Sequence, residues 1–357
     1  MSLKCGIVGL PNVGKSTLFN ALTNSNKAQA ENFPFCTIEP NVGVVPLKDK
    51  RLDALAKISN SEKKIYATVT FVDIAGLVKG ASKGEGLGNK FLSHIREVDT
   101  IIHMIRCFDS EEVQNVNKSI DPIRDLEIIE TEMMLADLES IQKRLEKNNK
   151  KNLEKNQQKI LETTLAIINE NKDLDEILTK FEVDEIKLSG LLCLKPKLYV
   201  CNVEEESIKN GNSYTNLFIE KYGDKNTIII SADIENQINQ LGTEEREKYM
   251  EMFKVTETGL DLLIKKAYKK LELETFFTSG PKESRAWTIN KNCPAPKAAG
   301  VIHSDFEKGF IRSETVSYDD FIENRGWSNS KQNGKIRLEG KDYMVKDGDV
   351  LNFRFNT

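Results

Sequence analysis

Apolar and polar positions alternate along the first 120 residues in a way that indicates strands joined by helices. A short apolar run at residues 5–8 is typical of a buried strand, and apolar residues at helical spacing follow it from Leu18. A second strand-like run covers residues 68–72, and a third ends near Cys107. The pattern predicts an α/β fold whose sheet is mostly parallel.

Two long helical patterns interrupt this alternation between residues 122 and 190, with apolar positions at 126–145 and at 153–174. Around their junction, residues 143–159 contain seven Lys or Arg and two Glu, a net charge of +5. We interpret the segment as a helical insertion of two antiparallel helices with a basic tip. The tip is either a solvated helix end or a contact for a phosphate backbone, and both interpretations stay open.

The sheet pattern resumes at Leu191, and a helix is expected near residues 259–271. We therefore expect a first domain at residues 1–274, which contains the insertion at 122–190, and a second domain at residues 275–357. The second domain has thirteen Lys or Arg and eleven Asp or Glu. Its net charge of +2 gives only weak electrostatic support for RNA binding.

Alternating positions in the second domain predict a small mixed sheet. Residues 345–353 alternate around Asp347-Gly348, which is a hairpin signature with its turn at these two residues. Residues 287–289 and 300–302 are assigned to strands of the same sheet.

The composition restricts the class of protein. A chain of 357 residues with 39% hydrophobic content is long enough for two or three domains with cores of their own. We expect no membrane span, because no stretch approaches ~18 consecutive apolar residues, and no signal peptide. Six scattered cysteines lack metal spacing, so we expect a cytoplasmic protein with reduced thiols. The formal charge of −4 argues against a nucleic-acid clamp over the whole surface.

The segment from Gly9 to Thr17, Gly-Leu-Pro-Asn-Val-Gly-Lys-Ser-Thr, lies between the first strand and the first helix. This is the spacing of a P-loop, whose glycines let the backbone wrap an anion so that consecutive N–H groups point at phosphates. Lys15 would reach the β- and γ-phosphates as the first catalytic group, and Ser16 would ligate Mg²⁺. The candidate nucleotide-binding residues here are Asn12, Val13, Gly14, Lys15, Ser16 and Thr17. The loop predicts that the chain binds a nucleoside triphosphate.

A second phosphate-site signal, Asp73-Ile74-Ala75-Gly76, follows an apolar strand about sixty residues later. An aspartate at the carboxyl end of a strand reaches the magnesium shell, here through a water molecule, and the Gly76 N–H can donate to the γ-phosphate. We therefore assign Asp73 to the metal site and Gly76 to the catalytic groups. Thr37, where a switch loop belongs, is the other candidate protein ligand for Mg²⁺.

The segment that would select the base is Asn202-Val203-Glu204-Glu205, where guanine-specific proteins have Asn-Lys-x-Asp. In that motif the aspartate accepts two hydrogen bonds from guanine that adenine cannot supply. Here the acid is Glu205, one methylene longer, and Val203 replaces the lysine, so we expect the guanine preference to be lost. Val203 would pack on the base, Asn202 would supply a polar contact, and Ser231 would lie in a loop that covers the base. An ordinary strand-to-loop junction is the alternative.

Together these residues resemble the Obg-like P-loop ATPases, and among them the YchF subfamily. The resemblance covers nearly the whole chain and is most specific at Gly9–Thr17, Asn32–Pro40, Asp73–Asn89, Asn202–Glu205 and Phe306–Arg312. It implies a P-loop NTPase domain that prefers ATP to GTP, a coiled-coil insertion, and a C-terminal β-grasp domain of the TGS type. It also implies association with the ribosome or a ribosomal subunit.

No side chain is assigned as a general base. Many GTPases carry a glutamine after Asp-x-x-Gly to orient the attacking water, and here that position is Leu77. His103 is expected to be a satisfied core residue of an apolar strand. His94, which follows the glycine-rich segment of residues 80–88, is the one candidate helper.

Charge neutralisation is therefore expected to come from Lys15, Mg²⁺ and the N–H groups of residues 12–16. The resemblance to cation-dependent relatives implies that Asn12 helps to place K⁺ beside the phosphates. We expect slow intrinsic turnover that K⁺ or a partner accelerates.

Two classes of function stay open besides a guanine-specific GTPase, which Val203 and Glu205 oppose. In the first, the chain is a Mg²⁺-dependent ATPase, using GTP also or less well, that acts on the ribosome. In the second, it is a nucleotide-gated binding protein whose hydrolysis is incidental. The second domain and the basic 143–159 segment would then hold an RNA or protein partner.

Overall fold

The computed structural model describes residues 3–24, 41–74, 87–110, 119–146, 154–170, 172–241, 245–246, 248, 250–251 and 257–356. The chain divides into two units, and each is described by itself. The first unit holds Leu3–Val44 and Thr70–Leu263, and the second holds Val45–Val69 and Ile264–Thr357.

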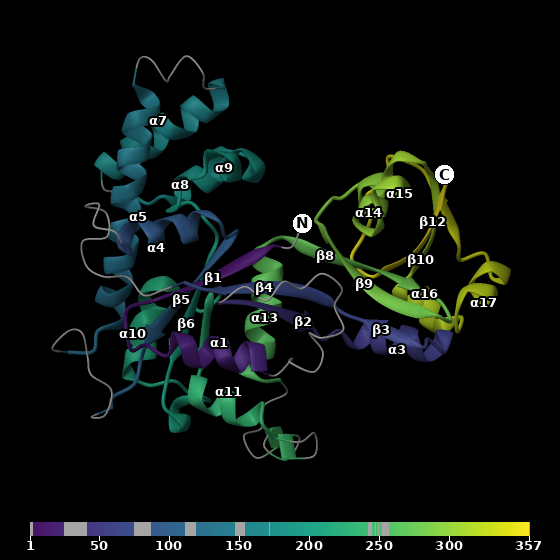
Figure 1. Cartoon of the computed structure of the whole chain (residues 1–357), viewed down its shortest axis with the longest axis horizontal. Coiled ribbons are helices and arrows are strands. Elements are labelled where there is room, and N and C mark those ends of the chain that lie inside the picture. The colour runs from purple at the N-terminus through teal and green to yellow at the C-terminus, as the bar shows by residue number, and fades with distance from the viewer. Residues whose placement is uncertain are drawn as a thin grey trace. The chain divides into compact units, whose positions relative to one another are not determined.

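A six-stranded sheet of order β2-β4-β1-β5-β6-β7 forms the centre of the first unit (Figure 1). Its strands are β1 (Lys4–Val8), β2 (Val42–Leu47), β4 (Ala67–Asp73), β5 (Thr100–Arg106), β6 (Lys197–Asn202) and β7 (Thr227–Ile230). The pairs β1–β4, β1–β5, β5–β6 and β6–β7 are parallel, which confirms the expected α/β fold. Because β1 lies between β4 and β5, the winding reverses beside it, and open α/β sheets bind ligands at such a point.

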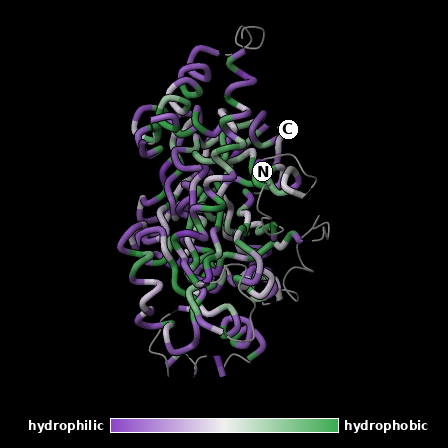
Figure 2. Tube along the Cα trace, turned by 90° about the vertical axis from the view of Figure 1, so that its left-hand side faces the viewer, coloured by the Kyte–Doolittle hydropathy of each residue, from purple (hydrophilic) through white to green (hydrophobic). Residues whose placement is uncertain are grey.

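The burial of the strands follows their place in this sheet. All seven residues of β5 are buried, as a central parallel strand requires. The helices of the unit are α1 (Lys15–Asn24), α4 (Leu87–Arg96), α10 (Ser213–Tyr222), α11 (Ala232–Ile238) and α13 (Gly259–Lys270), which continues into the second unit. In Figure 2 the hydrophobic positions gather in the interior and the hydrophilic positions on the outer turns.

The helical insertion lies between β5 and β6. It contains α5 (Pro122–Leu145), α7 (Lys155–Asn169), α8 (Asp175–Lys180) and α9 (Val183–Ser189). The long helices α5 and α7 pack on each other (Figure 1), through a core that includes Ile141, Ile160 and Leu161. The expected pair of antiparallel helices is confirmed.

Two basic side chains next to the tip of the insertion bind other groups of the insertion itself. Lys143 pairs with Glu139 at 2.6 Å, and the Arg144 guanidinium donates to the Ser189 carbonyl at 2.6 Å. The ion pair of Lys143 leaves less uncompensated positive charge for a partner than the count over 143–159 suggests, whereas Arg144 keeps its charge.

A second six-stranded sheet, of order β11-β10-β12-β8-β9-β3, forms the second unit. Its strands are β3 (Lys63–Ile65), β8 (Leu273–Ser279), β9 (Glu283–Asn290), β10 (Phe310–Ser317), β11 (Arg337–Glu339) and β12 (Asp349–Phe355). The pairs β12–β8 and β3–β9 are parallel and β8–β9, β10–β11 and β10–β12 are antiparallel, so the expected mixed sheet is confirmed. The helices of this unit are α3 (Lys50–Ser59), α14 (Ala295–Ile302), α15 (Ser304–Lys308), α16 (Tyr318–Glu323) and α17 (Trp327–Gln332).

Residues 45–69 belong to this second unit although they lie early in the chain. Asp49 caps α3 by accepting a hydrogen bond from the Arg51 N–H at 2.9 Å, and Asn60 ends the helix with a left-handed φ of 49°. The strand β3 then pairs with β9 at the edge of the sheet. The unit therefore includes this earlier segment as well as the residues after the boundary expected at 274/275.

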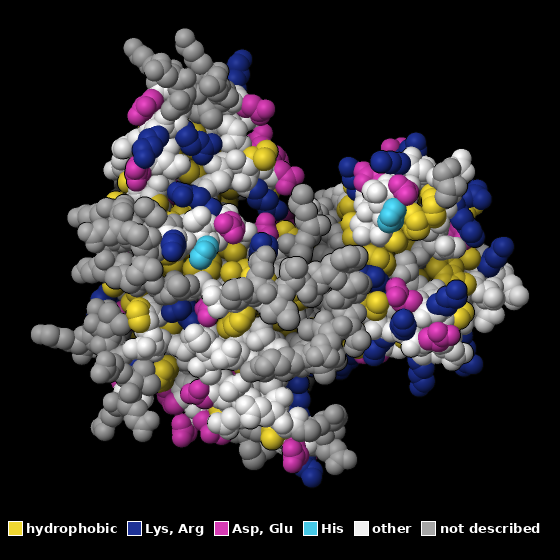
Figure 3. Space-filling view, viewed as in Figure 1, with side chains coloured by type: hydrophobic (Ala, Val, Ile, Leu, Met, Phe, Trp, Pro, Cys, Tyr) yellow, Lys and Arg dark blue, Asp and Glu magenta, His cyan; other side chains and the backbone are white. Residues whose placement is uncertain are grey.

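This grouping separates charge between the two units. The second unit carries 23 Lys or Arg against 16 Asp or Glu, a net charge of +7, while the rest of the chain carries 28 against 39, a net charge of −11. Lys and Arg side chains are spread over the surface of the part formed by β8 to β12 (Figure 3). The +2 counted from residue 275 onward is smaller because residues 45–69 and 264–274 supply the remainder.

Two sequence-based assignments in the second unit are wrong. Residues 300–302 end helix α14, whose start after Pro294 buries an alanine-rich face, and they are not a strand. Asp347-Gly348 is a turn, with φ of 89° at Gly348, but it does not join the strands of a hairpin. Before it, Met344 makes only an isolated bridge to Pro294. Residues 287–289 do lie in a strand, β9.

Candidate functional site

The P-loop connects the end of β1 to the start of α1 and is folded tightly against two neighbouring strands. A Cβ atom at Gly9 would lie 2.5 Å from the Met104 carbonyl oxygen of β5. Gly14 has a φ of +97°, and a Cβ atom there would lie 2.5 Å from the Nδ2 atom of Asn202 at the end of β6. Asn12 is also left-handed, with a φ of 63°. Only glycine fits at both close approaches, which explains the glycine spacing of the motif.

Lys15 folds back over this loop. Its Nζ atom donates to the Gly9 carbonyl at 3.0 Å and to the Leu10 carbonyl at 2.8 Å, and the residue is only 8% exposed. Burial lowers the pKa of Lys15, and the negative charge of Asp73 opposes this shift. A phosphate group beside the loop would give the ammonium a partner of full opposite charge.

Asp73 ends β4 beside the loop, since Ile7 of β1 lies opposite it in the parallel pair. Burial raises the pKa of Asp73, while the Lys15 charge and a hydrogen bond from the Ser16 hydroxyl act to lower it. Ser16 itself is exposed at the start of α1. Carboxylate and hydroxyl oxygens are ligands that Mg²⁺ accepts. The two side chains therefore fit a magnesium ion.

Asn202 joins the P-loop to the segment that follows β7. Its Nδ2 group donates to the Val13 carbonyl at 3.0 Å, and its Oδ1 atom accepts from the Ala232 N–H at 2.9 Å. The residue is 6% exposed, so both hydrogen bonds are shielded from water. Asn202 thus acts within the protein, and its expected contact with a base stays a prediction.

Of the other residues that were expected to contact the nucleotide base, Val203 lies in the interior and Glu205 lies at the surface. Val203 is 3% exposed and its side chain belongs to a core cluster, not to an open surface. Glu205 is exposed at the start of a 3-10 turn, Glu205–Ser207. Its neighbour Glu204 accepts hydrogen bonds from Ser207 and Asn212 at 2.6 and 3.0 Å. Burial acts to raise the pKa of Glu204, but these hydrogen bonds outweigh it and leave the pKa below its ordinary value.

Ala232 is a site residue that the sequence analysis missed. The expected residue, Ser231, is buried and precedes α11, but its side chain does not cap the helix. The group that meets Asn202 is instead the Ala232 N–H, the first of the helix. Helix starts present unpaired N–H groups, and this general rule is the signal that would have found it.

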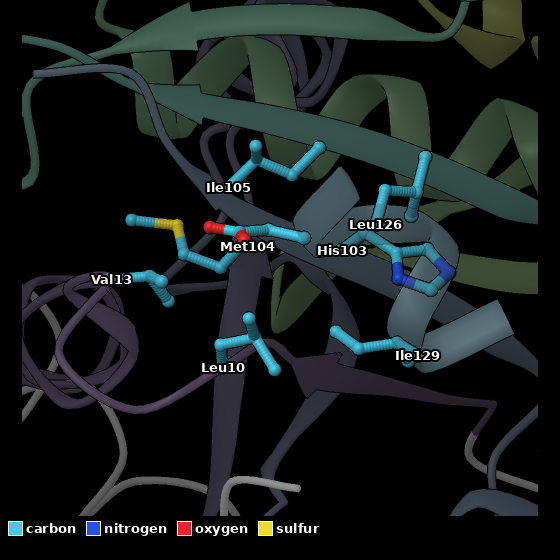
Figure 4. A pocket seen from close by; sticks show the side chains of 8 residues that line it. Leu10, Val13, His103, Met104, Ile105, Leu126 and Ile129 are labelled. Atoms are coloured by element: carbon cyan, nitrogen blue, oxygen red, sulfur yellow. The ribbon is translucent and has the colours of Figure 1, made fainter. Parts of the chain in front are cut away.

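A small pocket lies behind the P-loop, on the side of the insertion (Figure 4). Leu10 and Val13 line it from the loop, and Leu126 and Ile129 line it from α5. Figure 4 shows the Met104 side chain turned toward Val13. The first turns of the insertion therefore support the back of the phosphate loop.

His103 also lines this pocket and differs from its expected state. It is fully buried in β5, but neither ring nitrogen has a hydrogen-bond partner in the described part of the chain, so the expectation of a satisfied residue is wrong. Its ring stacks on Tyr199 with centroids 5.8 Å apart. Burial, and then the charge of Lys197, lower the pKa of His103 well below its usual range, which keeps it neutral. The other candidate, His94, is exposed on α4.

The remaining sequence-based expectations concern other site residues, the cysteines and membrane spans. Thr37 and Gly76 lie outside the described residues, and Thr17 is partly exposed in the first turn of α1. Cys5, Cys107, Cys193, Cys201 and Cys293 are free thiols. Among the helices that the structure describes, none is both long and apolar enough to cross a membrane.

The chain is similar to known proteins over its whole length. Residues 4–131 match a family described as a 50S ribosome-binding GTPase, and residues 273–356 match the C-terminal family of YchF GTPases, described as a protein of unknown function. The ribosome-binding ATPase YchF of Haemophilus ducreyi is 50% identical over 100% of both chains, and that of Bacillus subtilis is 46% identical over 100% of both.

A solved structure agrees with these sequence relatives. The YchF GTPase of Schizosaccharomyces pombe superposes with a TM-score of 0.87 at 35% identity, and the match covers 99% of this chain and 98% of that one. Identity of this level over 100% of both sequences, together with the P-loop, Asp73 and Asn202 arrangement, establishes that the chain belongs to the YchF family of P-loop NTPases.

Proposed function

We propose that this chain is a Mg²⁺-dependent NTPase that hydrolyses ATP, with GTP used also or less well. The observation that carries the proposal is the convergence of Lys15, Ser16 and Asp73 at the carboxyl edge of β1 and β4. A lysine over the loop, a hydroxyl at the helix start and a carboxylate at a strand end are the groups that phosphoryl transfer requires. The relatives named above carry the name ribosome-binding ATPase.

In this proposal the chain binds and neutralises the phosphates and leaves the attacking water to be oriented by other groups. The P-loop N–H groups and the Lys15 ammonium would bind the phosphate oxygens, and Ser16, Thr37 and Asp73 would hold Mg²⁺, Asp73 through a water. The metal supplies charge neutralisation at the β- and γ-phosphates. His103 is unsuited to act as a base because it faces the core behind the loop.

The preference for an adenine or a guanine nucleotide is tested by calorimetry. Nucleotide-free protein is titrated in parallel with ATP and with GTP, both with Mg²⁺, and ATP is expected to bind at least as tightly as GTP. A tenfold GTP preference, about 1.4 kcal/mol, would mean that the Asn202–Glu205 segment still selects guanine. Glu205→Ala separates the two cases, because an exposed Glu205 that contacts no base leaves both affinities unchanged.

The proposed K⁺ beside the phosphates is tested by kinetics. Asn12 is exposed and left-handed within the P-loop, next to the residues that would bind the phosphates. Turnover is expected to be faster in K⁺ than in Na⁺ at equal ionic strength, and Asn12→Ala is expected to remove the difference. Equal rates in the two salts would contradict the role of K⁺.

We further propose that the protein acts in the cytoplasm with the ribosome as its partner, and that residues 275–357 are a TGS domain. The names of the relatives support the ribosome, and the net charge of +7 on the second unit suits a partner rich in phosphate. The second candidate function, a nucleotide-gated binding protein with incidental hydrolysis, uses the same site and differs only in whether turnover matters.

A further inference from the structure

The edge of the second sheet at β3 and β9 carries three lysines that form no ion pair in the described part of the chain, although Glu283 lies opposite Lys63 in the strand register and its charge acts on Arg285. Lys57 near the end of α3, Lys63 on β3 and Lys282 before β9 are all exposed. Within the described residues, none of the three forms an ion pair. The Lys63 N–H donates to the Lys282 carbonyl at 3.2 Å, which holds these two residues together at the edge.

Next to this edge, the guanidinium of Arg285 lies over an aromatic ring on the same strand. Its guanidinium carbon is 3.9 Å from the Trp287 ring centroid. The indole is held in place, because its Nε1–H donates to the Thr278 hydroxyl at 2.9 Å and its ring stacks on Phe276 with an interplanar angle of 13°. Arg285 and Trp287 both remain partly exposed.

The Arg285 guanidinium has unused binding capacity. A guanidinium carries five N–H donors, and no acceptor among the described residues takes a hydrogen bond from Arg285. Its inner face covers Trp287, so its outer face and its edge are the parts open to a ligand. A planar cation in this position can continue a stack and donate hydrogen bonds at the same time.

We propose that Arg285 and Trp287 form a stacking platform for an unpaired base of single-stranded RNA, with Lys63 and Lys282 next to its phosphates. Bases in single-stranded RNA stack on guanidinium planes and aromatic rings, and clustered lysines follow the phosphate backbone. The net charge of +7 on this unit attracts such a strand, whereas the −11 on the rest of the chain repels it. The proposal rests on the ribosome as partner and specifies ribosomal RNA in unpaired form as the contact.

The test uses the full chain and a fluorescein-labelled twelve-nucleotide single-stranded RNA. Arg285→Lys keeps the charge and removes the plane, so it is expected to weaken binding about 5- to 150-fold, the range for loss of one stacked base. Arg312→Lys, at an exposed position of β10 in the same unit, is the matched control and is expected to bind like the wild type. Equal affinity of Arg285→Lys and wild type would overturn the proposal.

Fluorescence provides a readout that a purely structural role of Arg285 would not change. The chain has two tryptophans, Trp287 and Trp327. RNA is expected to quench the wild-type emission, and the quench is expected to disappear in Trp287→Phe. Emission that is quenched to the same extent in Trp287→Phe would place the RNA elsewhere and overturn the proposal.

Co-sedimentation with ribosomes separates this proposal from the proposed function. Loss of pelleting in Arg285→Lys, together with loss of RNA binding, supports the platform. If the wild type binds RNA through the platform but does not pellet with ribosomes, the ribosomal partner fails and the platform stands. If Arg285→Lys fails to pellet but binds free RNA normally, the surface contacts protein and the RNA assignment is overturned.

Discussion

Replacing Lys15 by alanine is expected to reduce ATP hydrolysis by about 10²- to 10³-fold, the usual cost of losing one preorganised group that stabilises charge in the transition state. The Nζ atom of Lys15 lies over the P-loop, where it donates hydrogen bonds to the Gly9 and Leu10 carbonyls. Among the described residues, Lys15 is the only lysine in this position. The measurement is single-turnover hydrolysis at saturating Mg²⁺-ATP, so that weaker binding does not lower the rate.

The fold is expected to survive this substitution. Burial disfavours the Lys15 ammonium, as its lowered pKa indicates, so its removal relieves a desolvation cost while two carbonyls lose a donor. Lys187→Ala, at an exposed position of α9, is the matched control and is expected to keep the wild-type rate. A rate for Lys15→Ala within threefold of the wild type, with the fold intact, would refute the assignment of the phosphate site.

Local sequence patterns predicted the parts of this site that local chemistry determines. Gly14 adopts a positive φ and Asp73 ends a strand, as the two motifs indicated, whereas the approach of Gly14 to Asn202 was not predicted. A glycine or a strand end is a property of a few neighbouring residues. For the same reason the parallel sheet and the helix pair of the insertion were predictable from periodicity.

Partners distant in sequence were not predictable in this way. No local pattern shows that β3 pairs with β9 more than 200 residues later, so residues 45–69 were assigned to the first domain. Asn202 was predicted to contact a base, but the partners of its side chain lie in the P-loop, at Val13, and at the start of α11, at Ala232. Residues 300–302 were misassigned because a short apolar run fits a strand as well as the end of a helix.

Replacing Glu235 by glutamine is expected to stabilise the protein above pH 7 and to change little near pH 4.5. Glu235 lies on α11, three residues after Ala232, and its Oε1 atom accepts a hydrogen bond from the Gly259 N–H at 2.6 Å at the start of α13. Its other oxygen is buried without a partner among the described residues. Burial raises the pKa of Glu235 to about 7, although the Gly259 and Leu260 N–H groups act to lower it.

The sign of the effect follows from proton binding. The folded state holds a proton on Glu235 up to about pH 7, whereas the unfolded chain releases it near the ordinary pKa of a glutamate, 4.5. Between these values the folded state binds more protons, so the free energy of unfolding falls as the pH rises. The full cost, of order 3 kcal/mol, applies above pH 7 and disappears below pH 4.5. Glutamine has the shape of the protonated acid, and because its side chain does not ionise, it does not lower the free energy of unfolding at high pH.

Urea unfolding at pH 8 and at pH 5 measures this difference. At pH 8 the free energy of unfolding of Glu235→Gln is expected to exceed that of the wild type by about 1 to 3 kcal/mol, and at pH 5 most of the gain should be absent. Glu220→Gln, an exposed position on α10, is the matched control and should change stability at neither pH. A gain of equal size at both pH values would show that packing, not protonation, is responsible, and would refute the raised pKa as the cause.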